Sequence, residues 1–306
     1  IYNAIVWQCR RTLPECNNLI NKGYSDLIKQ KTGLIIDSYF SATKIQWIIN
    51  NISTAQELID KKELIIGTID TWLIWNLTDG ESHLTEHTNA SRTMLYNINT
   101  LDWDNELLEI FNINKSVLPE ITNSTGHFGN ISKNIFNKSI PITGVAGDQQ
   151  AALFGQYGFN ENDTKCTYGT GCFILRNTGD KKITSNHGML TTIACNKKGE
   201  PVFALEGSVF IGGAVIQWLR DELKIINSAY ETNDIANSIE DTNGTYIVPA
   251  FSGLGAPYWD MESRGIITGI TRGTNRSHII RAALESIAFQ VNDLLEKPYL
   301  SFEGYL

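Results

Sequence analysis

The stretch Gly144-Val145-Ala146-Gly147-Asp148-Gln149-Gln150-Ala151-Ala152-Leu153-Phe154-Gly155 joins two kinds of local structure. The apolar run 140–146 is typical of a strand, and the Ala- and Gln-rich run after Gly147 favours a helix. Asp148 is therefore predicted where a strand ends and a helix begins. Its carboxylate can cap free N–H groups of the helix. It can equally face a ligand, because ligand crevices open at the carboxyl ends of strands in α/β sheets.

A second stretch, residues 166–177, is rich in β-forming residues and is interrupted by Gly169-Thr170-Gly171. Two glycines allow the backbone to adopt positive φ and bring N–H groups close to a ligand. The Thr170 hydroxyl can add a hydrogen bond to a phosphate oxygen. The alternative is an ordinary hairpin turn, in which Gly-x-Gly is common.

Together the two stretches suit phosphoryl transfer. Asp148 would act as the base for a hydroxyl nucleophile. The turn at 169–171 would hold the phosphoryl group that is transferred. We therefore predict that these two segments form the two halves of one site.

Composition limits the kinds of partner. The 306 residues are enough for two domains, and 42% hydrophobic residues are enough for a core. Twenty-five basic and 33 acidic residues give a formal net charge of −8, which argues against a nucleic-acid partner. No apolar run approaches the ~18 residues of a membrane span, so we expect no membrane partner.

The cysteines indicate the compartment. They are Cys9, Cys16, Cys166, Cys172 and Cys195. Their number is odd and no pair has the spacing of zinc ligands. We interpret them as reduced structural thiols, which fits a cytoplasmic protein.

Strands and helices are expected to alternate along the chain. Strands are predicted at 1–7, 64–68, 203–208, 246–249 and 265–270, and helices at 12–31, 39–51, 70–77, 211–223, 229–239 and 277–295. Ser41 is predicted to be an N-cap, and Trp72 and Trp75 are predicted to lie in the core. The alternation predicts an α/β fold in two lobes with the cleft near residue 157.

Several long motifs carry a family resemblance. They are Ala4-Ile5-Val6-Trp7-Gln8, the segments 39–47, 67–75, 88–95, 147–150 and 167–173, and Gly265-x-x-x-Gly269…His278…Ala282-x-x-Glu285. In them the chain resembles the glycerol kinases of the FGGY family of carbohydrate kinases, whose other members phosphorylate xylulose, ribulose and gluconate. The resemblance extends from residue 1 to about 295. It implies the two-lobed actin/hsp70-like (ribonuclease-H-like) ATPase fold.

The resemblance also implies a lobe organisation and a set of glycerol-binding residues. Residues 1–156 would form a partial N-terminal lobe on the glycerol side, and 157–306 a partial C-terminal lobe on the nucleotide side. Asp148 would be the general base and would help to hold Mg²⁺ through water. Gln149 and Tyr39 would bind glycerol hydroxyls, and Trp7 and Phe173 would contact its C–H side.

For the nucleotide, the resemblance implies that Gly169 and Thr170 contact the phosphates of ATP and that Gly213 and Gln217 lie along the nucleotide site. The reaction implied is in-line transfer of the γ-phosphoryl group of ATP to glycerol, which yields sn-glycerol 3-phosphate in glycerol catabolism. A homo-oligomer is expected for the full-length protein.

The chain also departs from the family pattern. The N-terminal phosphate loop and an Arg-Glu clamp would precede residue 1, two C-terminal segments of the adenosine pocket are missing, and residues 296–306 do not follow the family. Ser139 stands where some bacterial members place an Arg for fructose 1,6-bisphosphate, so that regulatory site is expected to be absent. We expect an internal fragment that is weak or inactive by itself.

Two alternatives to a glycerol kinase remain open. One is a related pentulose or polyol kinase on the same scaffold, although Trp7, Tyr39 and Phe173 favour a small triol. The other is a non-catalytic remnant of a split gene. A substrate panel separates the first from a glycerol kinase, and the flanking coding sequence tests the second.

Overall fold

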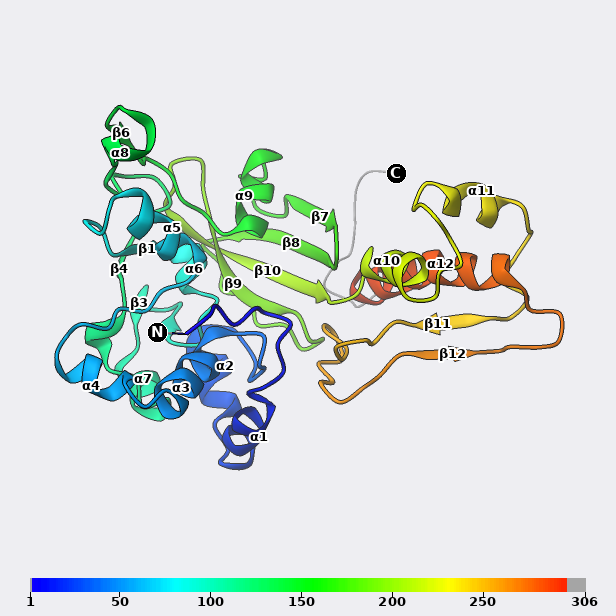
Figure 1. Ribbon diagram of the computed structural model, residues 1–306, viewed down its shortest axis with the longest axis horizontal. Coiled ribbons are helices and arrows are strands. Elements are labelled where there is room, and N and C mark those ends of the chain that lie inside the picture. Colours follow the sequence, from blue (N-terminus) through cyan, green and yellow to red (C-terminus); the bar gives the residue numbers. More distant parts are fainter. Residues whose placement is uncertain (1, 296–306) are drawn as a thin grey trace. The chain divides into compact units, whose positions relative to one another are not determined.

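The computed structural model describes residues 2–295 of the chain (Figure 1). They fall into two compact units. The first comprises the residues up to 165 together with 175–184 and 190–205, and the second comprises 166–174, 185–189 and the residues from 206 onward. No helix among the described residues is long and apolar enough to cross a membrane.

The first unit is mainly helical. Its helices are α1 (Leu13–Asn21), α2 (Ser25–Thr32), α3 (Ser41–Asn51), α4 (Ala55–Asp60), α5 (Ile69–Leu77), α6 (His87–Ala90), α7 (Asn105–Ile110), the 3₁₀ turn η1 (Lys115–Val117), α8 (Lys133–Phe136) and α9 (Asp148–Gly155). Short strands pair between them: β1 (Leu84–Glu86) with β4 (Glu120–Thr122) in parallel, and β2 (Tyr96–Asn97) with β3 (Asp102–Trp103) and β5 (Asn130–Ile131) with β6 (Ile140–Pro141) antiparallel.

A four-stranded sheet supports helix α9. Its order is β7 (Thr164–Tyr168), β8 (Cys172–Gly179), β10 (Pro201–Val209) and β9 (Leu190–Cys195). Leu153 of α9 packs against Leu175, Ala194 and Ala204, which come from three different strands. Burial of these apolar side chains holds the helix on the sheet.

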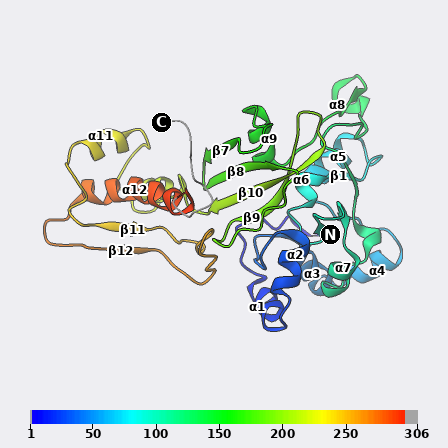
Figure 2. The ribbon, with the colours of Figure 1, turned by 180° about the vertical axis from the view of Figure 1, so that it is seen from behind.

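The second unit is built around its longest helix. Its elements are α10 (Ala214–Asp221), α11 (Glu231–Asn237), β11 (Tyr246–Val248), β12 (Ile266–Thr268) and α12 (Arg276–Leu295). Strands β11 and β12 pair antiparallel and α12 runs beside β11, as both Figure 1 and Figure 2 show. Val291 and Leu294 of α12 share a buried cluster with Cys172, Ile174 and Val209.

Most of the predicted helices are confirmed, with corrections at their ends and on their faces. Helix α3 begins at Ser41 and its N-cap is Phe40, so the predicted cap was wrong. Helix α10 is shorter than predicted and begins after Gly213. Helix α5 is confirmed, but Trp72 is 61% exposed and not in the core. A spacing of three residues places two aromatic side chains near one another on a helix without deciding which face is buried.

Three strand predictions were wrong. Residues 2–7 and 64–68 form no strand, whereas residue 1 lies outside the described residues. Residues 64–68 make one backbone bond to another segment, from Ile66 N to Val117 O at 2.8 Å. Of 140–146, only Ile140–Pro141 is a strand. An apolar run becomes a strand only where another strand completes its hydrogen-bond ladder. The interpretation of 296–306 also lies outside the described residues.

Candidate functional site

Asp148 is the first residue of helix α9, as predicted, but it is not the cap. Gly147 is the N-cap, and the exposed Asp148 carboxylate accepts a hydrogen bond from Gln149 Nε2 at 3.0 Å. Gln150 faces inward and donates to Ile193 O of strand β9 at 3.1 Å. The Gln150 side chain thus anchors the first turn of α9 to the sheet, and this determines the position of Asp148.

A buried carboxylate fixes the start of the same helix. Glu86 is fully buried at the end of β1 and accepts hydrogen bonds from Thr88 Oγ1 at 2.6 Å and Ser124 Oγ at 2.7 Å. The Thr88 hydroxyl gives its proton to Glu86, so its lone pairs accept the N–H of Gly147 at 2.8 Å. Burial raises the pKa of Glu86, and the donated hydrogen bonds oppose that rise.

Tyr39 and Trp7, two of the residues predicted to bind glycerol, lie next to one another. Their rings meet edge to face with centroids 5.5 Å apart. Asp37, which is fully buried, accepts from Tyr39 N at 2.6 Å and from Arg10 Nη1 at 2.7 Å. The Arg92 guanidinium carbon lies 5.7 Å from the centroid of the Tyr39 ring. Buried and half-buried charges therefore set the place of this aromatic pair.

Two buried charged groups here have shifted pKa values. Burial raises the pKa of Asp37, although Arg10 pulls it down. Burial lowers the pKa of Lys44 to about 8, and its ammonium donates to Ser38 O. Within the described chain, Asp37 Oδ2 has no hydrogen-bond partner. In both cases removal from water disfavours the charged form.

The predicted nucleotide residues come together in the second unit. Gly213 N donates to Gly169 O at 2.7 Å, and Gly212 N and Ala214 N donate to Thr170 O at 2.8 and 3.1 Å. Gly213 is the N-cap of α10, and Gln217 follows one helical turn later. The turn between β7 and β8 is therefore bound to the start of α10.

The positive φ predicted for the two glycines of that turn is not found. Neither Gly169 nor Gly171 has positive φ, and Gly169 N is bonded to Gly171 O at 2.9 Å. Glycine is required at 171 because a Cβ there would lie 2.5 Å from Val209 O. Phe173 is half-buried beside Gly171 in the same unit.

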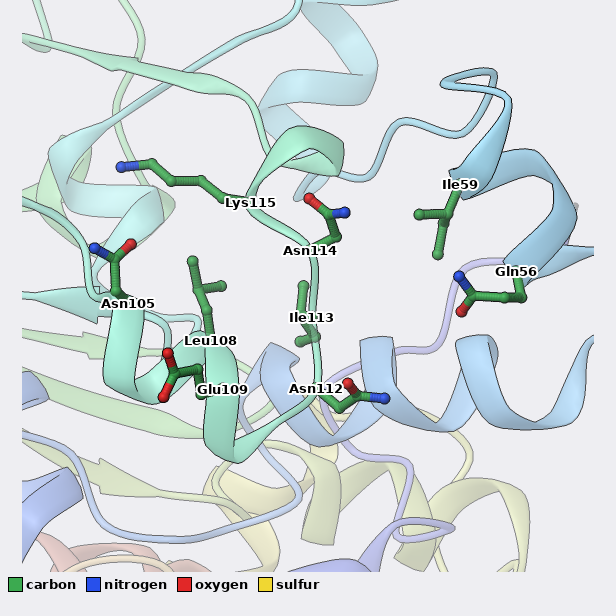
Figure 3. Close-up of a pocket in the computed structure, with 9 residues that line it drawn as sticks. All are labelled: Gln56, Ile59, Asn105, Leu108, Glu109, Asn112, Ile113, Asn114 and Lys115. Carbon is green, nitrogen blue, oxygen red and sulfur yellow. The ribbon is translucent and has the colours of Figure 1, made fainter.

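Two cavities open elsewhere in the first unit. One, of about 520 Å³, is shown in Figure 3. Its lining comes from α4, α7 and the segment after α7, and consists of Gln56, Ile59, Asn105, Leu108, Glu109, Asn112, Ile113, Asn114 and Lys115. A second cavity, of about 390 Å³, is lined by residues 101–103, 115 and 118–121. No predicted site residue lines either cavity, and among residues 2–295 no three His, Cys, Asp or Glu side chains form a metal-binding group.

Sequence reasoning missed the residues that support the site. These residues are Glu86, Thr88, Asp37 and Lys165, whose ammonium donates to Gln149 Oε1. The motifs as interpreted gave none of them a role, although Thr88 stands within one motif. The available signal was an acidic residue, Glu86, followed after His87 by the polar run Thr88-Asn89-Ala90-Ser91. Such a run is typical of an N-capping network and not of a solvated loop.

Models of one protein family match both halves of the chain. Residues 1–155 match the N-terminal domain of the FGGY family of carbohydrate kinases, and residues 164–298 match its C-terminal domain. Glycerol kinase from Clostridium botulinum (strain Langeland) is 59% identical over 296 residues, which are 97% of this chain and 59% of that protein. Glycerol kinase 2 from Thermotoga maritima is 57% identical, with 97% of this chain and 60% of that protein covered.

Solved structures of carbohydrate kinases also match the chain. A crystal structure of Plasmodium falciparum glycerol kinase with ADP matches with a TM-score of 0.83 and 47% identity, over 96% of this chain and 59% of that one. A ligand-bound xylulose kinase from Lactobacillus acidophilus shares the fold, with a TM-score of 0.79 and 24% identity over 96% of this chain and 59% of that one. The chain thus spans about three fifths of the length of the curated relatives it matches. The predicted α/β fold of the actin/hsp70-like ATPases is confirmed, and the chain belongs to the FGGY family of carbohydrate kinases.

Proposed function

We propose that the protein is a glycerol kinase, which transfers the γ-phosphoryl group of ATP to a primary hydroxyl of glycerol and forms sn-glycerol 3-phosphate. The identity of 59% to a glycerol kinase over 97% of the chain supports the substrate. The Plasmodium relative, which is 47% identical, was solved with ADP, and this supports ATP as the phosphoryl donor.

The observation that carries the proposal is the exposed Asp148 carboxylate at the start of a firmly anchored helix. A general base must be accessible to the hydroxyl and held in one place. Asp148 would take the hydroxyl proton while the oxygen attacks the γ-phosphorus and ADP departs with the bridging oxygen. Because the transfer has little covalent chemistry for the protein to do, positioning supplies most of the rate.

Glycerol would bind between polar and aromatic groups. Gln149 lies beside Asp148 and can hydrogen-bond a neighbouring hydroxyl, and we assign the same role to the Tyr39 hydroxyl. The edge-to-face pair of Trp7 and Tyr39 offers an apolar surface for C–H groups. We assign Phe173 to the C–H side of glycerol as well.

The nucleotide would lie on the turn at 169–171 and the start of α10. Gly169 and Thr170 are exposed there, and Gly213 has no Cβ to obstruct a phosphate. The N–H of Gly213 is already bonded to Gly169 O, so this residue would contribute space and not a donor. Gln217 is exposed one turn further along α10 and would border the nucleotide.

Mg²⁺ would accompany the phosphates of ATP and neutralise part of their charge. The exposed Asp148 carboxylate fits this ion, because Mg²⁺ prefers oxygen ligands and keeps several of its waters. We assign Asp148 a contact to Mg²⁺ through water.

A chimaera tests the proposed activity. The segment of the Clostridium botulinum enzyme that matches this chain is replaced by residues 2–295, and ATP-dependent phosphorylation is measured for the chimaera and for the 306-residue chain. Glycerol is compared with xylulose, ribulose and gluconate. Turnover of glycerol by either form supports the proposal. Absence of turnover in both, or a preference for a pentulose, contradicts it.

The role of Asp148 has its own test in the active form. Asp148→Asn should lower kcat by about 10²–10⁴-fold, the usual contribution of a general base, while the far-UV circular dichroism stays unchanged. Asp60→Asn is the matched control, because Asp60 lies at the end of α4 and its side chain contacts Gln56. Retention of full activity in Asp148→Asn would remove this residue from the base role.

A further inference from the structure

Lys165 is a buried cation that contacts the residue after the candidate base. It lies in strand β7 and is 2% exposed. A buried ammonium group is unfavourable unless acceptors surround it. One of its acceptors is Oε1 of Gln149, the neighbour of Asp148 in the first turn of α9.

The ammonium decides which way the Gln149 amide points. The oxygen and nitrogen of a side-chain amide look alike, and their assignment depends on the groups around them. An ammonium group only donates hydrogen bonds, so the atom of Gln149 that faces Lys165 must be the carbonyl oxygen. The NH₂ group is thereby turned toward Asp148, and it donates to Oδ2 at 3.0 Å.

We propose that Lys165 is a positioning residue that fixes Gln149 as a hydrogen-bond donor of the substrate site. An ionised carboxylate only accepts, and the outward NH₂ of Gln149 only donates. A polyol is then bound in one hydrogen-bonding arrangement. The hydroxyl at Asp148 donates a hydrogen bond to the carboxylate, and the adjacent hydroxyl accepts one from the Gln149 NH₂ group. The polyol part of this inference rests on the proposed function.

This arrangement has a chemical consequence for the reacting hydroxyl. A hydroxyl that donates to the carboxylate keeps its oxygen lone pairs available for the phosphorus. If the amide were reversed, Oε1 would face the Asp148 carboxylate, and two acceptors would repel one another. Gln149 would then turn away or offer the substrate an acceptor in place of a donor. Lys165 prevents that reversal.

The first test observes the amide itself in the 306-residue chain. Glutamine side chains are labelled with ¹⁵N, and the NH₂ signals of Gln149 are assigned from their loss in Gln149→Ala. Lys165→Met should shift both signals and speed their exchange with water. The control is Gln46, which donates to Phe111 O at 3.1 Å and should not change. Unchanged Gln149 signals in Lys165→Met would overturn the inference.

The second test is a double-mutant cycle on glycerol kinetics in whichever form is active. Lys165→Met should raise the KM for glycerol about tenfold, as expected for one lost hydrogen bond, with a much smaller change in kcat. In a Gln149→Ala background the same change should add less than twofold, because Lys165 acts through Gln149. Additive effects would overturn the inference.

Gln149→Glu covers the case in which Lys165→Met does not fold. The glutamate keeps an acceptor for Lys165, loses the donor and places a second carboxylate beside Asp148. A raised KM for glycerol supports the inference and an unchanged KM overturns it. The two proposals fail separately. If no form phosphorylates glycerol, the proposed function fails, while the amide signals still decide whether Lys165 orients Gln149.

Discussion

Asp37, Lys44 and Glu86 are charged side chains that the fold places out of water. Each one is bonded to the backbone or side chain of a residue that leads to the candidate site: Asp37 to Tyr39, Lys44 to Ser38, and Glu86 to Thr88. Burial of such groups is unfavourable unless their hydrogen bonds are satisfied, and removal of one partner is costly. These residues therefore hold the candidate site in place, although their burial lowers the free energy of unfolding.

Lys44 should make stability depend on pH. Burial lowers its pKa to about 8 in the folded chain, from its ordinary 10.5 in the unfolded chain. Between these values the unfolded chain holds a proton that the folded chain lacks, so the free energy of unfolding rises with pH. The rise attributable to Lys44 is at most about 3 kcal/mol.

The measurement compares urea unfolding of the wild type and Lys44→Met across that pH range. The difference in the free energy of unfolding between the two should grow in favour of the wild type from pH 8 to 10.5. Lys61→Met removes an exposed ammonium and corrects for the loss of one positive charge. A difference that stays constant with pH would show that Lys44 is not perturbed.

At the scale of elements, the turn between β7 and β8 is held by backbone contacts on both sides. The start of α10 donates three hydrogen bonds to it, and the end of β10 lies against Gly171. Backbone atoms cannot move aside as a flexible side chain can. The position of the turn is therefore determined by α10 and β10 together, which suits its proposed role of binding phosphate in one geometry.

A matched pair of glycine substitutions tests this packing. An alanine at 171 would place its Cβ 2.5 Å from Val209 O and 3.1 Å from Phe210 O, whereas at 169 the nearest atom is 3.8 Å away. Gly171→Ala should lower the free energy of unfolding by about 1–3 kcal/mol. Gly169→Ala should change it by less than about 1 kcal/mol, because neither clash nor positive φ opposes it. Equal effects in thermal unfolding would contradict the packing.

Across the whole molecule, acidic residues outnumber basic ones and the formal net charge is −8. Nucleic-acid binding depends on clustered Lys and Arg that replace the counterions of the phosphates. We expect retention on an anion exchanger at neutral pH and no change in the anisotropy of a labelled DNA duplex at physiological salt. A basic protein with the same probe is the control. Salt-sensitive binding by this chain would contradict the expectation.

The local sequence pattern was enough to predict the helices near the candidate site. The apolar repeat of residues 45, 48 and 49 predicted α3, and the change of composition at Gly147 predicted the start of α9. Both signals reflect backbone conformation over a few neighbouring residues. Strands were predicted less well, since 64–68 has the composition of a strand but no partner that would make it one.

The sequence by itself determined the fold class, the family and the place of Asp148 at a helix start, because long motifs and local periodicity are written in consecutive residues. Only the tertiary structure decided what holds those residues. Thr88 and Gly147 are 59 positions apart, and Lys165 and Gln149 are 16 apart on a strand and a helix. Hydrogen bonds between such positions have no period in the sequence, and they form only when burial has brought the elements together.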